Sequence, residues 1–123
     1  MVPIGSTATV TIVVTKKNTA KAVGSGSLDV FATPMMIALM EQAARECFTN
    51  SLADGDTSVG TQINVAHIAA SKIGVEVSAT ATVAAVEGRK ISFDVIAHEG
   101  DKEIGRGTHE RFVVSEERFM AKL

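Results

Sequence analysis

A single carboxylate directly follows the most apolar stretch of the chain, where a charged group could do acid–base chemistry. Glu41 comes immediately after residues 35–40, which are six apolar residues in a row. A carboxylate on a buried helix costs free energy unless it is paired or hydrogen-bonded. The opposite interpretation is that the helix reaches solvent here, because Gln42, Arg45 and Glu46 follow. Glu41 is therefore either a catalytic group or an exposed helix residue.

Thr33 places a hydroxyl at the start of the same helix. Threonine favours the N-cap position and proline the first helical position, and Pro34 follows directly. The hydroxyl could simply cap the helix. Alternatively, the free N–H groups and positive dipole end of the helix could hold an anionic oxygen beside it. Thr33 and Glu41 are eight residues apart, so they lie about 80° apart around the helix, on roughly the same side.

His67 ends an alternating segment and shares its face with Ile63 and Val65. Its ordinary pKa, near 6.5, suits a general acid or base at neutral pH. The alternative is a structural histidine packed among apolar side chains. His98 and His109 are too distant in sequence from His67 to suggest a metal site, and no His/Cys ligand spacing is present, so we expect no metal.

Length and composition limit the possible classes of protein. The chain has 123 residues, which favours one domain over residues 1–123. A net charge of −2 makes nucleic acid an unexpected partner. No apolar run reaches the roughly 20 residues of a membrane span, and the N-terminus does not have the pattern of a signal peptide. The lone Cys47 favours a reducing, cytoplasmic location.

The pattern of elements predicts an α+β fold. Residues 16–29 are polar, with glycine and serine at 24–27, and are the best candidate for a mobile loop or lid. Tight turns at Gly88 and Gly100 make the last three strands antiparallel. Ser115 can cap a short terminal helix over residues 116–122. We expect strands over residues 7–15, 58–67, 74–86, 90–98 and 103–114, and one long helix over residues 34–51.

The helix is the most informative of these elements. Because residues 35–40 are apolar at every position, the pattern predicts a helix buried on all sides. One central helix wrapped by an antiparallel sheet of about five strands is the hotdog arrangement. Such a sheet has a free edge, so two copies can pair edge to edge into a homodimer. The 46% hydrophobic content, with apolar surface to spare, agrees with a subunit interface.

Several segments taken together resemble the fluoroacetyl-CoA thioesterase-like family of hotdog proteins. They follow one another in the expected order and spacing over nearly the whole chain from Phe31 onward. The segments are residues 30–33 (VFAT), 39–41 (LME), 59–61 (VGT), 65–70 (VAHIAA), 86–89 (VEGR) and 104–111 (IGRGTHER).

This resemblance implies a homodimeric enzyme that hydrolyses acyl-CoA thioesters without a cofactor. It implies that Thr33, Glu41 and His67 form the catalytic set. It also implies that Gly60 helps to position the thioester carbonyl and that Arg111 lies at the substrate site. Glu41 could then orient His67, activate water or attack the carbonyl directly, while Thr33 could bind or act as nucleophile.

Two departures from the fluoroacetyl enzyme concern the substrate. Pro34 stands where that enzyme is expected to have glycine, and residues 18–30 are short and contain no aromatic residue. We therefore expect short or medium acyl groups to be accepted. The alternatives are a hotdog enoyl-CoA hydratase, whose Asp/His motif is absent here, and a non-catalytic acyl-CoA-binding module. The complete Thr33, Glu41 and His67 set argues against the module.

Overall fold

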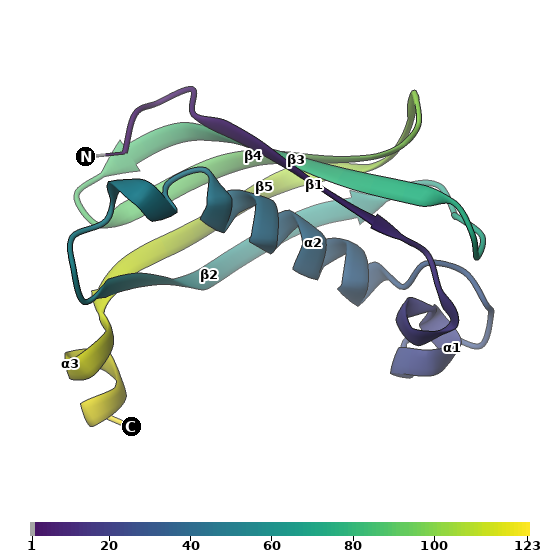
Figure 1. Cartoon of the computed structure of the whole chain (residues 1–123), viewed down its shortest axis with the longest axis horizontal. Coiled ribbons are helices and arrows are strands. Elements are labelled where there is room, and N and C mark those ends of the chain that lie inside the picture. The colour runs from purple at the N-terminus through teal and green to yellow at the C-terminus, as the bar shows by residue number, and fades with distance from the viewer. Residues whose placement is uncertain (1) are drawn as a thin grey trace.

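The computed structural model describes residues 2–123, which form a five-stranded sheet with the order β1-β3-β4-β5-β2. All neighbouring strands are antiparallel, and for the last three strands of the chain the short turns predict this. This arrangement, with one long helix on the sheet, confirms the α+β hotdog fold (Figure 1). The strands are β1 (Thr7–Val13), β2 (Asp56–His67), β3 (Glu76–Glu87), β4 (Lys90–Glu99) and β5 (Lys102–Ser115).

The long helix α2 (Thr33–Glu46) lies across one face of the sheet (Figure 1). Its buried side chains belong to Met36, Leu39, Met40, Ala43 and Ala44. They join a core that includes alternate residues of β3, from Val77 to Val83, as the alternation predicts. The prediction of a helix buried on all sides is wrong for the single chain, since Ala38 is exposed. The sheet covers only one side of α2.

Both ends of α2 differ from the prediction. The helix begins at Thr33, so the N-cap is Ala32, which has no side chain for capping. The Thr33 hydroxyl is thereby available for another partner. The helix ends at Glu46, and the backbone leaves the helical region at Phe48, whose φ is −142°. A short 3-10 turn follows at Thr49–Ser51, with the Thr49 hydroxyl donating to the carbonyl of Arg45 at 2.7 Å.

The segment expected to be a loop or lid contains helical structure. A 3-10 turn covers Lys16–Asn18, and helix α1 covers Ala20–Val23. Thr15 caps the first and Thr19 caps the second, and Gly24 ends α1 with a φ of 79°. These threonine caps precede only a few residues each, which is why a purely compositional interpretation predicted a loop.

The C-terminal helix α3 (Glu116–Ala121) forms as predicted, with the Ser115 hydroxyl accepting from the backbone N–H of Arg118. It projects from one end of the sheet (Figure 1). Over residues 2–123, no helix is both long enough and apolar enough to cross a membrane.

Candidate active site

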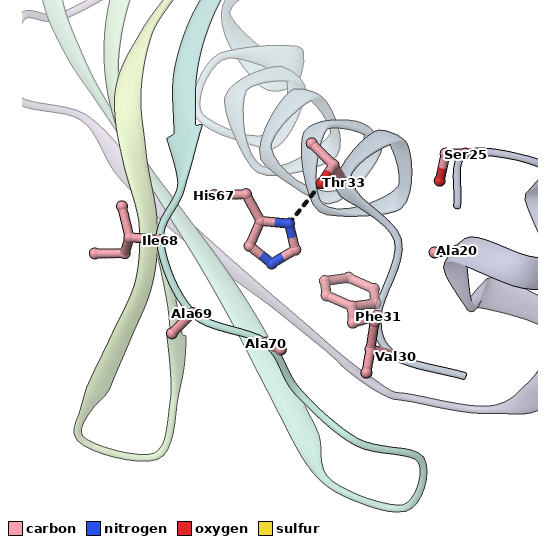
Figure 2. A pocket seen from close by; sticks show the side chains of 9 residues that line it. All are labelled: Ala20, Ser25, Val30, Phe31, Thr33, His67, Ile68, Ala69 and Ala70. Carbon is pink, nitrogen blue, oxygen red and sulfur yellow. Dashed lines mark hydrogen bonds between the residues drawn. The ribbon is translucent and has the colours of Figure 1, made fainter. Parts of the chain in front are cut away.

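Thr33 and His67 meet at the start of α2 and the end of β2. The Thr33 hydroxyl oxygen lies 2.8 Å from Nδ1 of His67 (Figure 2). Phe31 packs edge-on against the imidazole, with ring centroids 6.5 Å apart. The pair opens into a cavity of about 270 Å³ whose other lining residues are mostly small, namely Ala20, Ser25, Val30, Ile68, Ala69 and Ala70.

The surroundings of His67 favour its neutral form. Burial lowers the pKa of this imidazole, and the backbone of Ala69 opposes that shift by a smaller amount. A neutral ring can accept the Thr33 hydroxyl proton at Nδ1. The other nitrogen, Nε2, is buried and has no hydrogen-bond partner within residues 2–123. The pair is therefore arranged as a hydroxyl beside a base.

Glu41 and Arg111 form a second cluster, further along α2. The Arg111 guanidinium donates to Oε2 of Glu41 at 3.0 Å and is only 4% exposed. It also donates through Nε to the Ser58 hydroxyl at 2.9 Å and through Nη2 to the Ser58 carbonyl at 3.2 Å. Glu41 is thus neither an unpaired buried charge nor a free solvent-exposed residue. Its carboxylate is held by an arginine.

Gly60 lies on β2 against this second cluster. A Cβ atom at position 60 would stand 2.5 Å from Oε2 of Glu41 and 3.3 Å from both Arg111 and His109. No side chain fits there without moving the carboxylate. The glycine therefore brings the strand backbone close to Glu41, and the lining of a small cavity beside Gly60 includes Glu41 and His109.

A β-bulge decides that the two clusters lie on the same face of the sheet. Gly60 and His67 are seven residues apart, and an odd spacing on a regular strand points side chains to opposite faces. The register between β2 and β5 shifts between Gly60 and Gln62, so Gly60 pairs with Arg111 while His67 pairs with Gly105. The extra residue restores the common face, toward α2.

The single chain therefore holds the predicted residues as two separate groups. Thr33 contacts His67, whereas Glu41, Gly60 and Arg111 lie together with His109. Within the described chain there is no hydrogen bond or ion pair between Glu41 and His67. Two turns of α2, about 12 Å along the helix axis, separate Thr33 from Glu41. The expectation that Glu41 orients His67 is not met by contacts inside one chain.

Two members of the second cluster were not singled out from the sequence. Ser58 carries two acceptors for Arg111, and His109 lies between Arg111 and the backbone of β2. The available signal was the alternation of His109 and Arg111 on one face of the last strand. That alternation indicates neighbours, but it does not reveal which buried group they face.

A long helix across a five-stranded antiparallel sheet, with a hydroxyl–imidazole pair at a cavity, defines the class of hotdog-fold thioesterases. The chain belongs to the family described as fluoroacetyl-CoA-specific thioesterase, FlK, whose model matches residues 14–117.

Relatives of known identity agree with this assignment. The chain is 47% identical over 95 residues to the fluoroacetyl-CoA thioesterase of Streptantibioticus cattleyicolor, covering 77% of this chain and 68% of that protein. A solved structure of the fluoroacetyl-CoA thioesterase FlK superposes with a TM-score of 0.91 at 40% identity, covering 98% of this chain and 93% of the other. A thioesterase superfamily member from Thermus thermophilus superposes with a TM-score of 0.91 at 27% identity, covering 99% and 90%.

Proposed function

We propose that this thioesterase hydrolyses short or medium acyl-CoA thioesters at the cavity beside Thr33 and His67. The observation that carries the proposal is the 2.8 Å contact between the Thr33 hydroxyl and Nδ1 of a neutral His67. Thioester hydrolysis needs a nucleophile, a proton acceptor and a site for the developing oxyanion. The pair supplies the first two requirements without a cofactor.

His67 can accept and later return the proton that the reaction transfers. Attack on the thioester carbonyl, by Thr33 or by a water at its hydroxyl, transfers one proton to Nδ1. The tetrahedral intermediate then collapses, the C–S bond breaks, and CoA leaves as a thiol after taking that proton. If Thr33 attacks, a water repeats the sequence on the threonine ester and releases the acid. At the start of α2, Pro34 has no N–H and those of Met35 and Met36 donate to the Ala32 carbonyl. The N–H of Thr33 is therefore the donor there that can stabilise the oxyanion.

The lining of the cavity supports a broad choice of short acyl groups. Residues 18–30 contain no aromatic side chain, and they contribute Ala20, Ser25 and Val30 to the cavity wall. None of these lining side chains is bulky enough to discriminate between acyl groups that differ in one small substituent. Fluoroacetyl-CoA and acetyl-CoA should therefore be hydrolysed with kcat/KM values within about tenfold of each other, because a small change in an apolar contact is worth little. A preference of several hundredfold for fluoroacetyl-CoA would contradict this.

We also propose a homodimer in which two β2 strands pair through their free edges. β2 is the last strand of the sheet, so one of its edges is unpaired. Antiparallel pairing of β2 with its copy, with residue 60 opposite residue 67, would bring the Glu41 cluster of one protomer to the Thr33–His67 pair of the other. Directly opposite residues share a face, and both clusters already lie on the helix side.

The same register accounts for exposed apolar side chains outside the clusters. It places Ile68, which is 58% exposed, opposite Val59 of the second copy. Val59 pairs on β5 with Phe112, which is 41% exposed. Apolar groups would thus meet apolar groups across the new edge. This agreement supports the register, because it uses residues that play no part in the reaction.

Mixing inactive variants tests the shared active site. His67→Ala and Glu41→Gln should each be inactive alone. Refolded together in equal amounts, half of the dimers are mixed and each mixed dimer has one intact composite site, so about a quarter of the wild-type activity should return. His67→Ala mixed with Thr33→Ala is the matched control and should restore nothing, since both changes fall in the same cluster.

Two results would contradict the composite site. If the complete set lay within one chain, no mixture of these variants would recover activity. A monomer at micromolar concentration in sedimentation, with full turnover, would remove the homodimer itself.

A further inference from the structure

His109 is a buried histidine that the proposed reaction does not use. It is 2% exposed, and its ring stacks on Phe93 with centroids 5.8 Å apart and an interplanar angle of 27°. Its Nδ1 lies 2.7 Å from the carbonyl oxygen of Gln62, and its Nε2 lies 3.2 Å from Nη1 of Arg111. Both ring nitrogens are engaged, which packing alone would not require.

The partners of His109 fix its tautomer. A carbonyl can only accept a hydrogen bond, so Nδ1 must carry the proton that it donates to Gln62. A guanidinium can only donate, so Nε2 must present a lone pair to Arg111. His109 is therefore neutral, with one specific nitrogen protonated. Burial lowers the pKa of this imidazole, and the charge of Arg111 acts in the same direction, while Gln62, Glu41 and Glu110 oppose the shift.

The guanidinium of Arg111 is committed to its neighbours inside the chain. Four of its five N–H groups are used, by the Ser58 hydroxyl, the Ser58 carbonyl, Glu41 and His109. The two hydrogens of Nη1 go to different acceptors, Oε2 of Glu41 and Nε2 of His109. The acceptor on His109 thereby determines the direction of the hydrogen that reaches Glu41.

From this geometry we infer that His109 is a positioning residue, which orients Arg111 so that the Glu41 carboxylate is held at Gly60. The chain of contacts begins at the β-bulge, where the Gln62 carbonyl meets Nδ1. It passes through the imidazole to Arg111 and ends on Glu41. Arg111 then acts by holding Glu41 rather than by reaching toward the phosphates of CoA. The inference rests on the proposed composite site, in which Glu41 of one protomer reaches the Thr33–His67 pair of the other.

Two substitutions separate positioning from packing, because each preserves one of the two ring contacts. The side-chain oxygen of glutamine can occupy the place of Nε2 and accept from Arg111, whereas the amide nitrogen of asparagine can occupy the place of Nδ1 and donate to Gln62. His109→Gln should keep kcat for acetyl-CoA within about threefold, and His109→Asn should lose roughly tenfold to a hundredfold in kcat. KM should change little in either variant, since uniform binding is not what is lost.

The opposite order of the two variants, or equal turnover in both with unchanged folding, would overturn the inference. Such results would mean that His109 serves only as an anchor for β2 or as core. Thermal melts and CoA binding by calorimetry should be near normal in both variants, which would separate a turnover defect from unfolding.

A measurement on the unmodified protein remains decisive if both variants fail to fold. The ¹⁵N chemical shifts of His109 should show a protonated Nδ1 and an unprotonated Nε2 at neutral pH. The reverse tautomer, or a doubly protonated ring, would overturn the inference. If the wild-type protein released no thiol from acetyl-CoA, the proposed substrate would be wrong while the tautomer could still be as inferred.

Discussion

The two ends of β2 carry chemically different clusters. At one end, Thr33 and His67 share a single hydrogen bond beside a cavity, and Nε2 of His67 has no partner in the described chain. At the other end, Arg111 uses four N–H groups on three neighbouring residues, and the approach of the strand leaves no space for a Cβ at position 60. The Thr33–His67 pair can therefore transfer a proton, whereas the Arg111 cluster holds the charge of Glu41 in place.

The two clusters are therefore suited to different chemical tasks. A base must change its protonation state during turnover, so few fixed contacts suit it. A carboxylate that stabilises developing charge works best when it does not reorganise, so a dense network suits it. Variants at the first end should change the chemistry with little effect on folding, while variants at the second should act by displacing Glu41.

The largest effect is expected when the base or the carboxylate is removed. His67→Ala and Glu41→Gln should each lower turnover of acetyl-CoA by about 10²- to 10⁴-fold. If the two residues serve one proton-transfer task, the double variant should be little worse than either single variant. Steady-state thiol release measures all three. Strictly additive losses would indicate independent roles, and near-normal activity of Glu41→Gln would leave that residue with a structural role only.

Thr33 gives the next largest effect and isolates the hydroxyl. Since Ala32 occupies the N-cap of α2, Thr33→Ala should cost no more than about 1 kcal/mol of unfolding free energy, from the lost contact with His67. Turnover should nevertheless fall by roughly tenfold to a thousandfold, and Thr33→Ser should restore most of it. Urea unfolding and thiol release distinguish the two quantities. A large stability loss with activity retained would leave Thr33 with a structural role only.

Gly60→Ala tests the Glu41–Arg111 cluster without replacing a charged residue. The added methyl would collide with Oε2 of Glu41, so turnover should drop by about tenfold to a hundredfold while the fold is kept. Thr61→Ala is the matched control, because it alters the bulge without adding atoms toward Glu41, and it should remain active. Equal activity of Gly60→Ala and the wild type would mean that the position of the Glu41 carboxylate is not critical.

The smallest effect is a change in how stability depends on pH. Burial lowers the pKa of His109, so below its ordinary value near 6.5 the unfolded chain binds a proton there that the folded chain does not. Unfolding free energy should therefore fall as the pH drops from 6.5 toward 5.5. His109→Gln should have a shallower slope, although His67 contributes in the same direction. Denaturant midpoints across this window give the answer, and an unchanged slope would argue against a neutral His109.

The parts of the fold that depend on local patterns were predictable. The alternation from Val77 to Val83 identified a half-buried strand, and Ser115 identified the start of α3. The limits of α2 were not, since the backbone leaves the helical region at Phe48, where no glycine or proline marks the change. The helical turns within residues 16–29 were not predicted either, because they depend on threonine caps.

The candidate residues were predictable as types, but their grouping was not. Resemblance to the family identified Thr33, Glu41, His67, Gly60 and Arg111. A helical spacing of eight places Thr33 and Glu41 on roughly the same side of the helix, and the structure pairs each with a different strand residue. His109 was weighed from the sequence only as a metal ligand, and its two hydrogen bonds in the structure reveal a different role.

The extra residue in β2 makes the spacing of the strand as important as its composition. With one residue more or fewer between Gly60 and His67, every side chain beyond that point would turn over, and one of the two clusters would face away from α2. Substitutions at exposed positions such as Asn64 leave this parity intact. Substitutions between Gly60 and His67 can therefore be tolerated. An insertion or deletion there would put the two clusters on opposite faces of the sheet, even though none of their residues had been replaced.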